Sequence, residues 1–353
     1  MKFRVVLTAI TMALLLPLST SSVRAGPSGI ELQGNPDGSF SISGDFISLA
    51  YYGNSSPTFD SVGISKSSVI PVFEPLFESI DVQAFLPASD PIVSGESVQV
   101  SSDELAVEFH NNPMATIGFK AVDQSLVTFA FEEEIGAIVD SQLARLGKGG
   151  TTGELVTIGD ATLEKSFNQI RLRMNSGGRC YFRASVVPDE FVGQEISLGT
   201  IVGELYLTQI ESNVVTDLIQ YDSVSLSPSF VSAEKVAIEV SGEFSAGKVV
   251  VLSLDRAMFT VPADNLFVHV DGEEVARAGS LEQVFAGGSG STFFVSHDEG
   301  TLEVFVFLPH FSEHTVVLSG EGTAAFPWSI LAAALGATLV LLVATAYLFK
   351  KKY

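Results

Sequence analysis

Apolar and polar residues alternate along much of the chain at the two-residue spacing of half-buried β-strands. The alternation is clear at Leu105, Val107 and Phe109, which are separated by a small residue and a charged one. In the C-terminal third, short runs of this kind are divided by turn signals such as Asp271-Gly272. About seven short strands at such spacing predict a mainly β protein whose residues 232–320 form a β-sandwich of immunoglobulin-like architecture.

One segment follows the helical period instead. Three glutamates open Glu132–Leu146 and Gly147 follows it, as the helix dipole and a glycine C-cap favour. We therefore predict one amphipathic helix over 132–146, inside a central β-rich region at 113–231 that follows an N-terminal β-rich region at 26–112. The apolar residues that recur at helical spacing are Ile135, Ile138, Val139, Leu143 and Leu146.

The N-terminus has the pattern of a cleavable secretory signal. Lys2 and Arg4 precede an apolar run, and small residues lie before Gly26. The alternative is an uncleaved anchor, but the run is short for a membrane span and contains Pro17. Residues 1–25 are accordingly predicted to be a signal peptide.

The C-terminus carries a longer uncharged run. Residues 328–349 contain no charged side chain, and at ~1.5 Å per residue a helix of this length crosses a hydrocarbon layer of ~30 Å. Lysines follow at once, and such lysines stay on the cytoplasmic side. The sequence predicts a single-pass plasma-membrane protein with its N-terminal ectodomain outside, a linker at 321–327, one transmembrane helix at 328–349 and a cytoplasmic tail at 350–353.

Charge and cysteine content narrow the range of functions. The chain has 19 basic and 41 acidic residues, a net charge of −22. Six of the basic residues lie in the two predicted end segments, so the 13 that remain against 41 acids leave the exported part at −28. A nucleic-acid binder needs a basic footprint, and this chain has none of that size. One cysteine excludes an intramolecular disulfide framework, and no cofactor is predicted.

Basic residues nevertheless gather in one short segment, Ile170–Ala184. Alternation on each side of residues 175–179 predicts a hairpin that pairs Met174 with Cys180, with Cys180 buried on the apolar face. A basic patch on an acidic body is suited to an acidic ligand or to another copy of the chain, and local salt bridges are the alternative use of these residues. The predicted patch consists of Arg171, Arg173, Arg179, Tyr181 and Arg183.

Two further motifs concern metal binding and glycosylation. His310, Glu313 and His314 match H-x-x-E-H, in which two histidines one helical turn apart hold zinc and the glutamate activates water. The motif lies between two strand-like runs, so we expect a hairpin connection there in place of the helix that zinc binding needs. Asn54 begins the sequon Asn54-Ser55-Ser56 and is a candidate glycosylation site.

The order of these features resembles that of membrane-anchored cell-surface proteins of prokaryotes, archaea especially. A secretory signal, an acidic β-rich ectodomain, one span and a few lysines follow one another in both. The resemblance covers the chain as architecture and no motif assigns a characterised family. It implies a non-enzymatic role in adhesion, envelope assembly or ligand contact, with envelope components or another copy as partner. The alternative is a membrane-anchored hydrolase that uses His310, Glu313 and His314 or a carboxylate pair.

Overall fold

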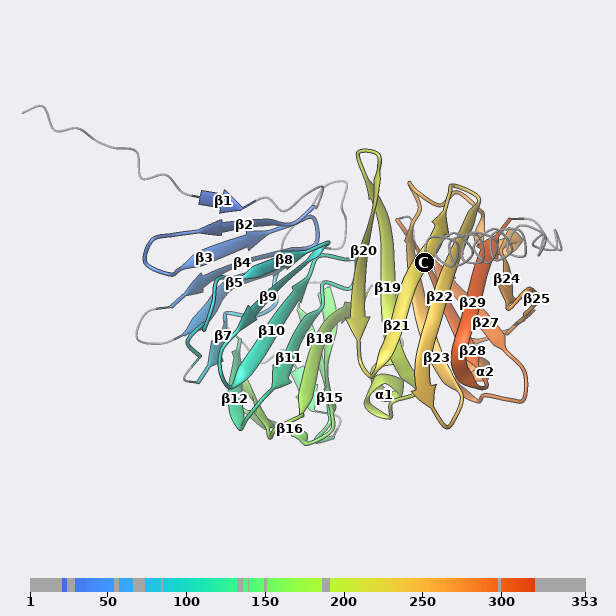
Figure 1. Ribbon diagram of the computed structural model, residues 1–353. Coiled ribbons are helices and arrows are strands. Elements are labelled where there is room, and N and C mark those ends of the chain that lie inside the picture. Colours follow the sequence, from blue (N-terminus) through green and yellow to red (C-terminus); the bar gives the residue numbers. More distant parts are fainter. Residues whose placement is uncertain are drawn as a thin grey trace, which may run out of the picture.

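The computed structural model describes residues 21–23, 29–53, 57–65, 74–83, 85–131, 136–138, 140–148, 151–185, 191–297 and 300–320. Strands account for 60 % of the structure and helices for 5 %, which confirms the mainly β class. Figure 1 shows two β bodies side by side, the first coloured blue to green and the second yellow to red. Each body has two sheets with an apolar core between them.

The first sandwich joins a ten-stranded sheet to an eight-stranded sheet. The ten-stranded sheet contains β1 (Ser21–Val23), β2 (Glu31–Gly34), β3 (Phe40–Ser43), β4 (Ile47–Tyr52), β5 (Thr58–Ile64), β6 (Glu74–Pro75), β7 (Ser79–Val82), β12 (Ser125–Ala130), β16 (Ala161–Ser166) and β17 (Gln169–Met174). Their order is β1-β2-β3-β4-β5-β7-β12-β17-β16, with β6 paired to β5.

The eight-stranded sheet covers the other side of the same core. It contains β8 (Ile92–Ser94), β9 (Ser97–Ser101), β10 (Leu105–His110), β11 (Ile117–Ala121), β13 (Gly136–Ile138), β14 (Leu143–Lys148), β15 (Thr151–Ile158) and β18 (Arg179–Ser185), in the order β13-β14-β15-β18-β11-β10-β9-β8. Alternation sets which side chains enter the core: in β10, Leu105, Val107 and Phe109 are buried, as the sequence pattern predicts.

The second sandwich joins a six-stranded sheet to a five-stranded sheet. The six-stranded sheet contains β19 (Ile201–Ile210), β20 (Asn213–Gln220), β23 (Lys248–Asp255), β26 (Ala276–Arg277), β27 (Thr292–His297) and β28 (Thr301–Leu308), in the order β20-β19-β23-β28-β27-β26. The five-stranded sheet contains β21 (Val224–Val231), β22 (Lys235–Phe244), β24 (Phe267–Val270), β25 (Glu273–Glu274) and β29 (Phe311–Ser319), in the order β21-β22-β29-β24-β25. The short helices are α1 (Val192–Ser197), η1 (Ala263–Asn265) and α2 (Leu281–Phe285).

Two details of this sandwich bear on the sequence predictions. Asp271 and Gly272 have φ of 54° and 86° and turn the chain from β24 into β25, where Val270 pairs with Glu273. This is the turn that the Asp-Gly dipeptide predicts. In the other sheet, β19 pairs in parallel with β23, a departure from the two antiparallel sheets of the immunoglobulin architecture.

The six-stranded sheet is covered on both faces. Val250 and Leu252 of β23 point into the core of the second sandwich, whereas Val249 and Val251 belong to a separate apolar cluster shared with Tyr181 of the first sandwich. The same cluster takes in residues of α1 and α2. The two sandwiches are therefore joined by an apolar junction in addition to the chain itself.

The helix predicted over 132–146 is wrong. Gly136–Ile138 and Leu143–Lys148 form strands, and β14 pairs with β15 from Leu143↔Val156 to Lys148↔Thr151. Asp140 makes the turn between them, since its Oδ1 accepts the backbone N–H groups of Gln142 and Leu143. Tertiary pairing with β15 outweighs the local helical spacing.

The strand pairings cross the region boundaries predicted from the sequence. β10 pairs with β11 across residue 112, and β21 pairs with β22 across residue 231. At the N-terminus, Ser21–Val23 of the predicted signal peptide pair with β2. Within the described residues, no helix has the length and apolar character needed to cross a bilayer. The predicted span at 328–349 lies outside those residues.

Candidate functional site

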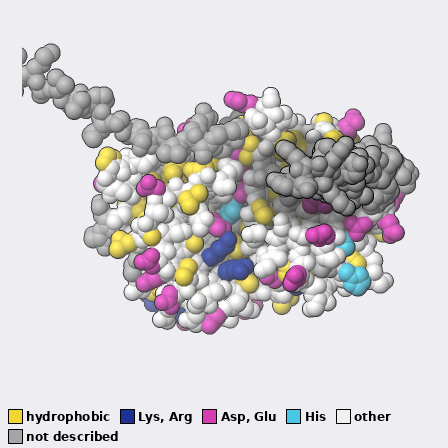
Figure 2. Space-filling view, viewed as in Figure 1, with side chains coloured by type: hydrophobic (Ala, Val, Ile, Leu, Met, Phe, Trp, Pro, Cys, Tyr) yellow, Lys and Arg dark blue, Asp and Glu magenta, His cyan; other side chains and the backbone are white. Residues whose placement is uncertain are grey.

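The polar groups that converge in the described part of the chain lie where the two sandwiches meet. The first sandwich contributes β10, β11 and β18, and the second contributes β19 and β20. Figure 2 shows a small group of basic side chains near the middle of this face, between the two bodies, with acidic side chains scattered over the rest. We use the name junction network for Glu108, His110, Asn112, Lys120 and Asp217.

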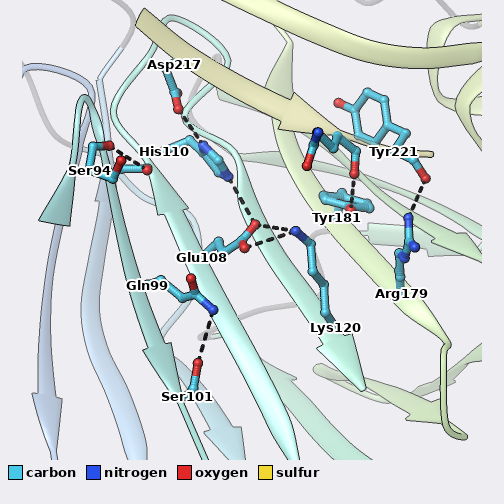
Figure 3. A network of polar contacts seen from close by, with 12 residues as sticks. Ser94, Gln99, Ser101, Glu108, His110, Lys120, Arg179, Tyr181, Asp217 and Tyr221 are labelled. Carbon is cyan, nitrogen blue, oxygen red and sulfur yellow. Dashed lines mark hydrogen bonds and ion pairs between the residues drawn. The ribbon is translucent and has the colours of Figure 1, made fainter. Parts of the chain in front are cut away.

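His110 is the centre of the junction network (Figure 3). Its Nδ1 lies 2.7 Å from Oδ1 of Asp217 in β20, and its Nε2 lies 3.7 Å from Oε2 of Glu108. Lys120 Nζ approaches the two oxygens of Glu108 at 2.8 and 3.0 Å. The chain of contacts therefore runs from the second sandwich through a buried imidazole to a lysine on β11.

Asn112 fixes Asp217 from the other side. Its Nδ2 donates to Oδ2 of Asp217 at 2.7 Å, and its Oδ1 accepts the backbone N–H of Met114 at 3.0 Å. Both carboxylate oxygens of Asp217 are thus bonded to the first sandwich, and the residue is 3 % exposed. A carboxylate so enclosed holds the two bodies in one register.

The charges of the junction network shift the pKa values of its members. Burial opposes protonation of His110, but the charge and hydrogen bond of Asp217, aided by Glu108, raise the pKa of the imidazole to about 9. Burial likewise acts to raise the pKa of Glu108, but His110 and Lys120 lower it to about 2. At neutral pH a positively charged imidazole therefore lies between two carboxylates.

A second ion pair crosses the junction in a drier place. Arg183 of β18 and Glu204 of β19 approach to 3.0 Å, and their side chains are 5 % and 0 % exposed. Burial acts to lower the pKa of Arg183, but the charge of Glu204 outweighs it and holds this pKa above its ordinary value. Removing either partner would leave an uncompensated charge between the sandwiches.

Tyr181 and Arg179 complete the contacts of β18. The Tyr181 ring stands at 87° to the Tyr221 ring with centroids 4.8 Å apart. Its hydroxyl donates to the carbonyl of Gln220 at 2.7 Å, and Nη1 of Arg179 donates to the carbonyl of Tyr221 at 2.9 Å. These contacts bind β18 to the end of β20 (Figure 3).

The five residues of the predicted basic patch are divided between two places. Arg179, Tyr181 and Arg183 lie on β18 and face the second sandwich, while Arg171 and Arg173 lie exposed on β17. The alternation within each strand is as predicted, and Cys180 is buried as expected. The predicted hairpin, however, is wrong. β17 pairs with β12 and β16 in one sheet, and β18 pairs with β11 and β15 in the other.

Glycine accounts for the crossing between the sheets. Gly177 has a φ of 82°, and a Cβ on Gly178 would collide with the carbonyl of Asp160. Two backbone hydrogen bonds hold the turn: the N–H of Asn175 donates to the Asp160 carbonyl at 3.0 Å, and the N–H of Gly177 donates to the Ala121 carbonyl at 3.0 Å. The chain therefore passes from one layer to the other where a hairpin turn was expected.

The histidine motif has no metal-binding geometry. His314 lies in β29, where its Nδ1 is 2.7 Å from Oδ2 of Asp271 and its Nε2 is 2.8 Å from the carbonyl of His310. Both ring nitrogens face oxygen acceptors of the protein, and Glu313 is exposed. Among the described residues no group of three or more His, Cys, Asp or Glu side chains is placed to hold a metal.

The connection that carries this motif also differs from the predicted hairpin. β28 belongs to the six-stranded sheet and β29 to the five-stranded sheet, so residues 309–310 carry the chain between layers. The glycosylation candidate Asn54 lies outside the described residues.

The charged residues that meet at the junction are not among the sites predicted above, although two of them leave a signal in the sequence. Glu204 interrupts the apolar strand Ile201-Val202-Gly203-Glu204-Leu205, and Asp217 interrupts another at Val214–Ile219. A charged residue inside a strand that is otherwise apolar on both faces indicates a buried ionic partner.

Comparison with known proteins adds no assignment. No family model matches the chain, and no curated protein matches it. A crystal structure of the YidC insertase with its first transmembrane domain resolved aligns with 51 % of this chain at 11 % identity and a TM-score of 0.32. The aligned part spans 43 % of that structure, less than half of its length. A likeness of this degree establishes neither fold nor function.

Proposed function

We propose that the chain is a non-enzymatic surface protein that is anchored in the plasma membrane and presents a rigid two-sandwich ectodomain for adhesion or envelope assembly. The observation that carries this proposal is the junction between the sandwiches. Its buried charges are paired across the junction, His110 with Asp217 and Arg183 with Glu204, so they serve to fix the two bodies in one register.

The anchoring part of the proposal rests on the sequence. The predicted leader at 1–25 and the uncharged run at 328–349 followed by lysines support an orientation in which the acidic body lies outside the cell. A net charge of −28 keeps such a body soluble and directs it toward basic or cationic surfaces.

Rigidity gives this arrangement a mechanical use. Two sandwiches that share an apolar cluster and two buried ion pairs transmit a force or an orientation from the membrane to the far end without a flexible hinge. Arg171 and Arg173 lie outside the junction and are exposed, so they are accessible to envelope components or to another copy of the chain.

The test uses intact cells that carry the full chain, its Arg171→Gln/Arg173→Gln variant, or no chain. External protease should release the ectodomain from intact cells, and cells with the wild-type chain should bind isolated envelope material or one another more strongly than cells without it. The double variant should reach the surface at wild-type level and bind less.

Two results would overturn the proposal. An ectodomain protected until the cells are lysed contradicts the orientation. Adhesion that is the same with and without the chain, at equal surface display, contradicts the role. Stoichiometric zinc that is lost in His310→Ala, with hydrolytic activity, would favour the membrane-anchored hydrolase instead.

A further inference from the structure

The outer face of the ten-stranded sheet carries an ordered row of side chains. Strand register places Thr58 opposite Asp81, Asp81 opposite Thr128, Thr128 opposite Arg171 and Arg171 opposite Glu164. Thr58, Asp81 and Thr128 are half-buried and Arg171 and Glu164 are exposed, as expected for the sheet face that points away from the core. The row therefore runs across β5, β7, β12, β17 and β16.

Opposite charges flank the central strand of this row. Asp81 lies one strand from β12 on one side, and its carboxylate accepts the hydroxyls of Thr58 at 2.9 Å and Ser79 at 3.2 Å. Arg171 lies one strand from β12 on the other side. Glu164 is 3.5 Å from Arg173, and no described residue forms an ion pair with Arg171. Arg171 is thus an exposed cation, and Glu164, the acid opposite it in β16, lies within ion-pair distance of Arg173 instead.

We propose that this face binds the same face of a second copy, with a twofold axis along β12. Rotation about an axis in the plane of the interface and parallel to β12 keeps each residue at its level along the strand and exchanges the strands on either side. Asp81 of each copy then lies over Arg171 of the other, and the two charge pairs form together.

The neighbouring levels fit the same axis. Leu126, also on β12, lies over Leu126 of the second copy. On its two sides are Arg173 of β17 and Gln83, whose N–H donates to the Leu126 carbonyl from the β7 side. The rotation therefore places Arg173 of each copy over Gln83 of the other. Glu164 lies over Thr58. Among the described residues of these five strands, the operation therefore brings no two like charges into register, although the body as a whole is strongly acidic.

The size of the surface predicts a weak association. Five strands spaced ~4.8 Å apart and about six residues long give roughly 500 Å² on each copy, at the low end for specific interfaces. Repulsion between the acidic bodies reduces the affinity further. Salt screens this repulsion, so the affinity first rises with salt concentration, and it falls at higher salt because the two ion pairs are screened as well. Copies held in one membrane meet at high effective concentration, where weak contacts suffice.

The test uses the full chain in detergent and a pair of complementary variants. Asp81→Arg leaves two cations on the face and Arg171→Asp leaves two anions, so each variant alone should lose self-association measured by sedimentation. An equimolar mixture of the two should associate at least as well as wild type, because every contact then joins opposite charges. Asp103→Arg, an equal change of charge at the exposed turn between β9 and β10 of the eight-stranded sheet, is the matched control and should behave like wild type.

The outcomes separate cleanly. Association that is lost in each variant and regained in the mixture supports the interface. Three results with the variants overturn it: association that persists in both variants, association that is lost equally in Asp103→Arg, and association that does not return in the mixture. A wild-type chain that stays monomeric at the highest concentration overturns it as well. The result does not depend on the proposed adhesive role, because the readout is association of the purified protein.

Discussion

Replacing Asp217 by asparagine tests whether the junction network holds the two sandwiches together. The change keeps the size of the side chain but removes its charge. It also replaces one acceptor oxygen by an NH₂ group. Both groups that face Asp217, His110 Nδ1 and Asn112 Nδ2, are hydrogen-bond donors toward it, so the new NH₂ group would face a donor. One buried hydrogen bond is lost and the imidazolium loses its closest counter-charge.

The magnitude follows from the pKa of His110. A rise from 6.5 to about 9 corresponds to about 3 kcal/mol of folding free energy, at about 1.4 kcal/mol per unit, of which Asp217 supplies the larger part and Glu108 the rest. Because the pKa is raised in the folded state, this stabilisation is fully present below pH 6.5 and is lost as the pH rises through about 9. The loss of one partner of a buried charged pair gives a similar figure, about 3 kcal/mol or more.

Urea unfolding of the full chain in detergent, followed by circular dichroism at pH 6 and pH 9.5, measures this effect. We expect Asp217→Asn to lower the free energy of unfolding by about 3 kcal/mol at pH 6 and by about 1 kcal/mol at pH 9.5, where the remaining difference is the lost hydrogen bond. Asp123→Asn, at an exposed turn, is the control and should change little at either pH. An equal loss at both pH values, or no loss at pH 6, would refute the reasoning.

Three other predictions concern different parts of the molecule. Arg183→Met or Glu204→Met alone should lower the free energy of unfolding by about 3–5 kcal/mol, and the double variant should lose less than either, because no unpaired charge is left buried. Chemical denaturation measures these changes, and a loss in the double variant equal to the sum of the single losses would contradict the prediction. Cys180 should resist a maleimide reagent at pH 8 until the protein is unfolded, since burial raises the pKa of its thiol well above the ordinary value, and rapid labelling of the folded chain would show that the site opens. The full chain should carry no stoichiometric zinc by elemental analysis, and His314→Ala should not change its metal content, because both nitrogens of His314 face protein oxygens; zinc at one equivalent would refute this.

The sequence supports the strand content and most facing patterns because alternation is a local property. In β17 and β18 the apolar and charged faces follow directly from the residues, and so does the burial of Cys180. Which strands pair is set by contacts that are distant in sequence. The predicted hairpin required β17 and β18 to be neighbours, whereas the Gly177-Gly178 turn sends them to opposite sheets.

The helix predicted over 132–146 failed for the same physical reason. Its apolar spacing fits either a helix or two short strands around a turn, and β15 supplies the hydrogen-bonding edge that decides between them. The buried ion pairs of the junction could be predicted only in part. Glu204 and Asp217 are conspicuous as charges in apolar strands, but their partners Arg183 and His110 lie 21 and 107 positions away in the chain.

The covering of the six-stranded sheet on both faces imposes an order on synthesis. The first sandwich has its core complete within residues 30–184, so it can fold as soon as that length has emerged. The second sandwich contributes Ile219 and Tyr221 to the apolar cluster that it shares with Tyr181, and the Tyr221 ring packs on Tyr181 itself, so this edge is complete only when both sandwiches have folded. We therefore expect the first sandwich to fold first and the second to complete its packing against it. A chain cut between residues 185 and 191 would yield one fragment with a complete core and one that exposes apolar surface and aggregates.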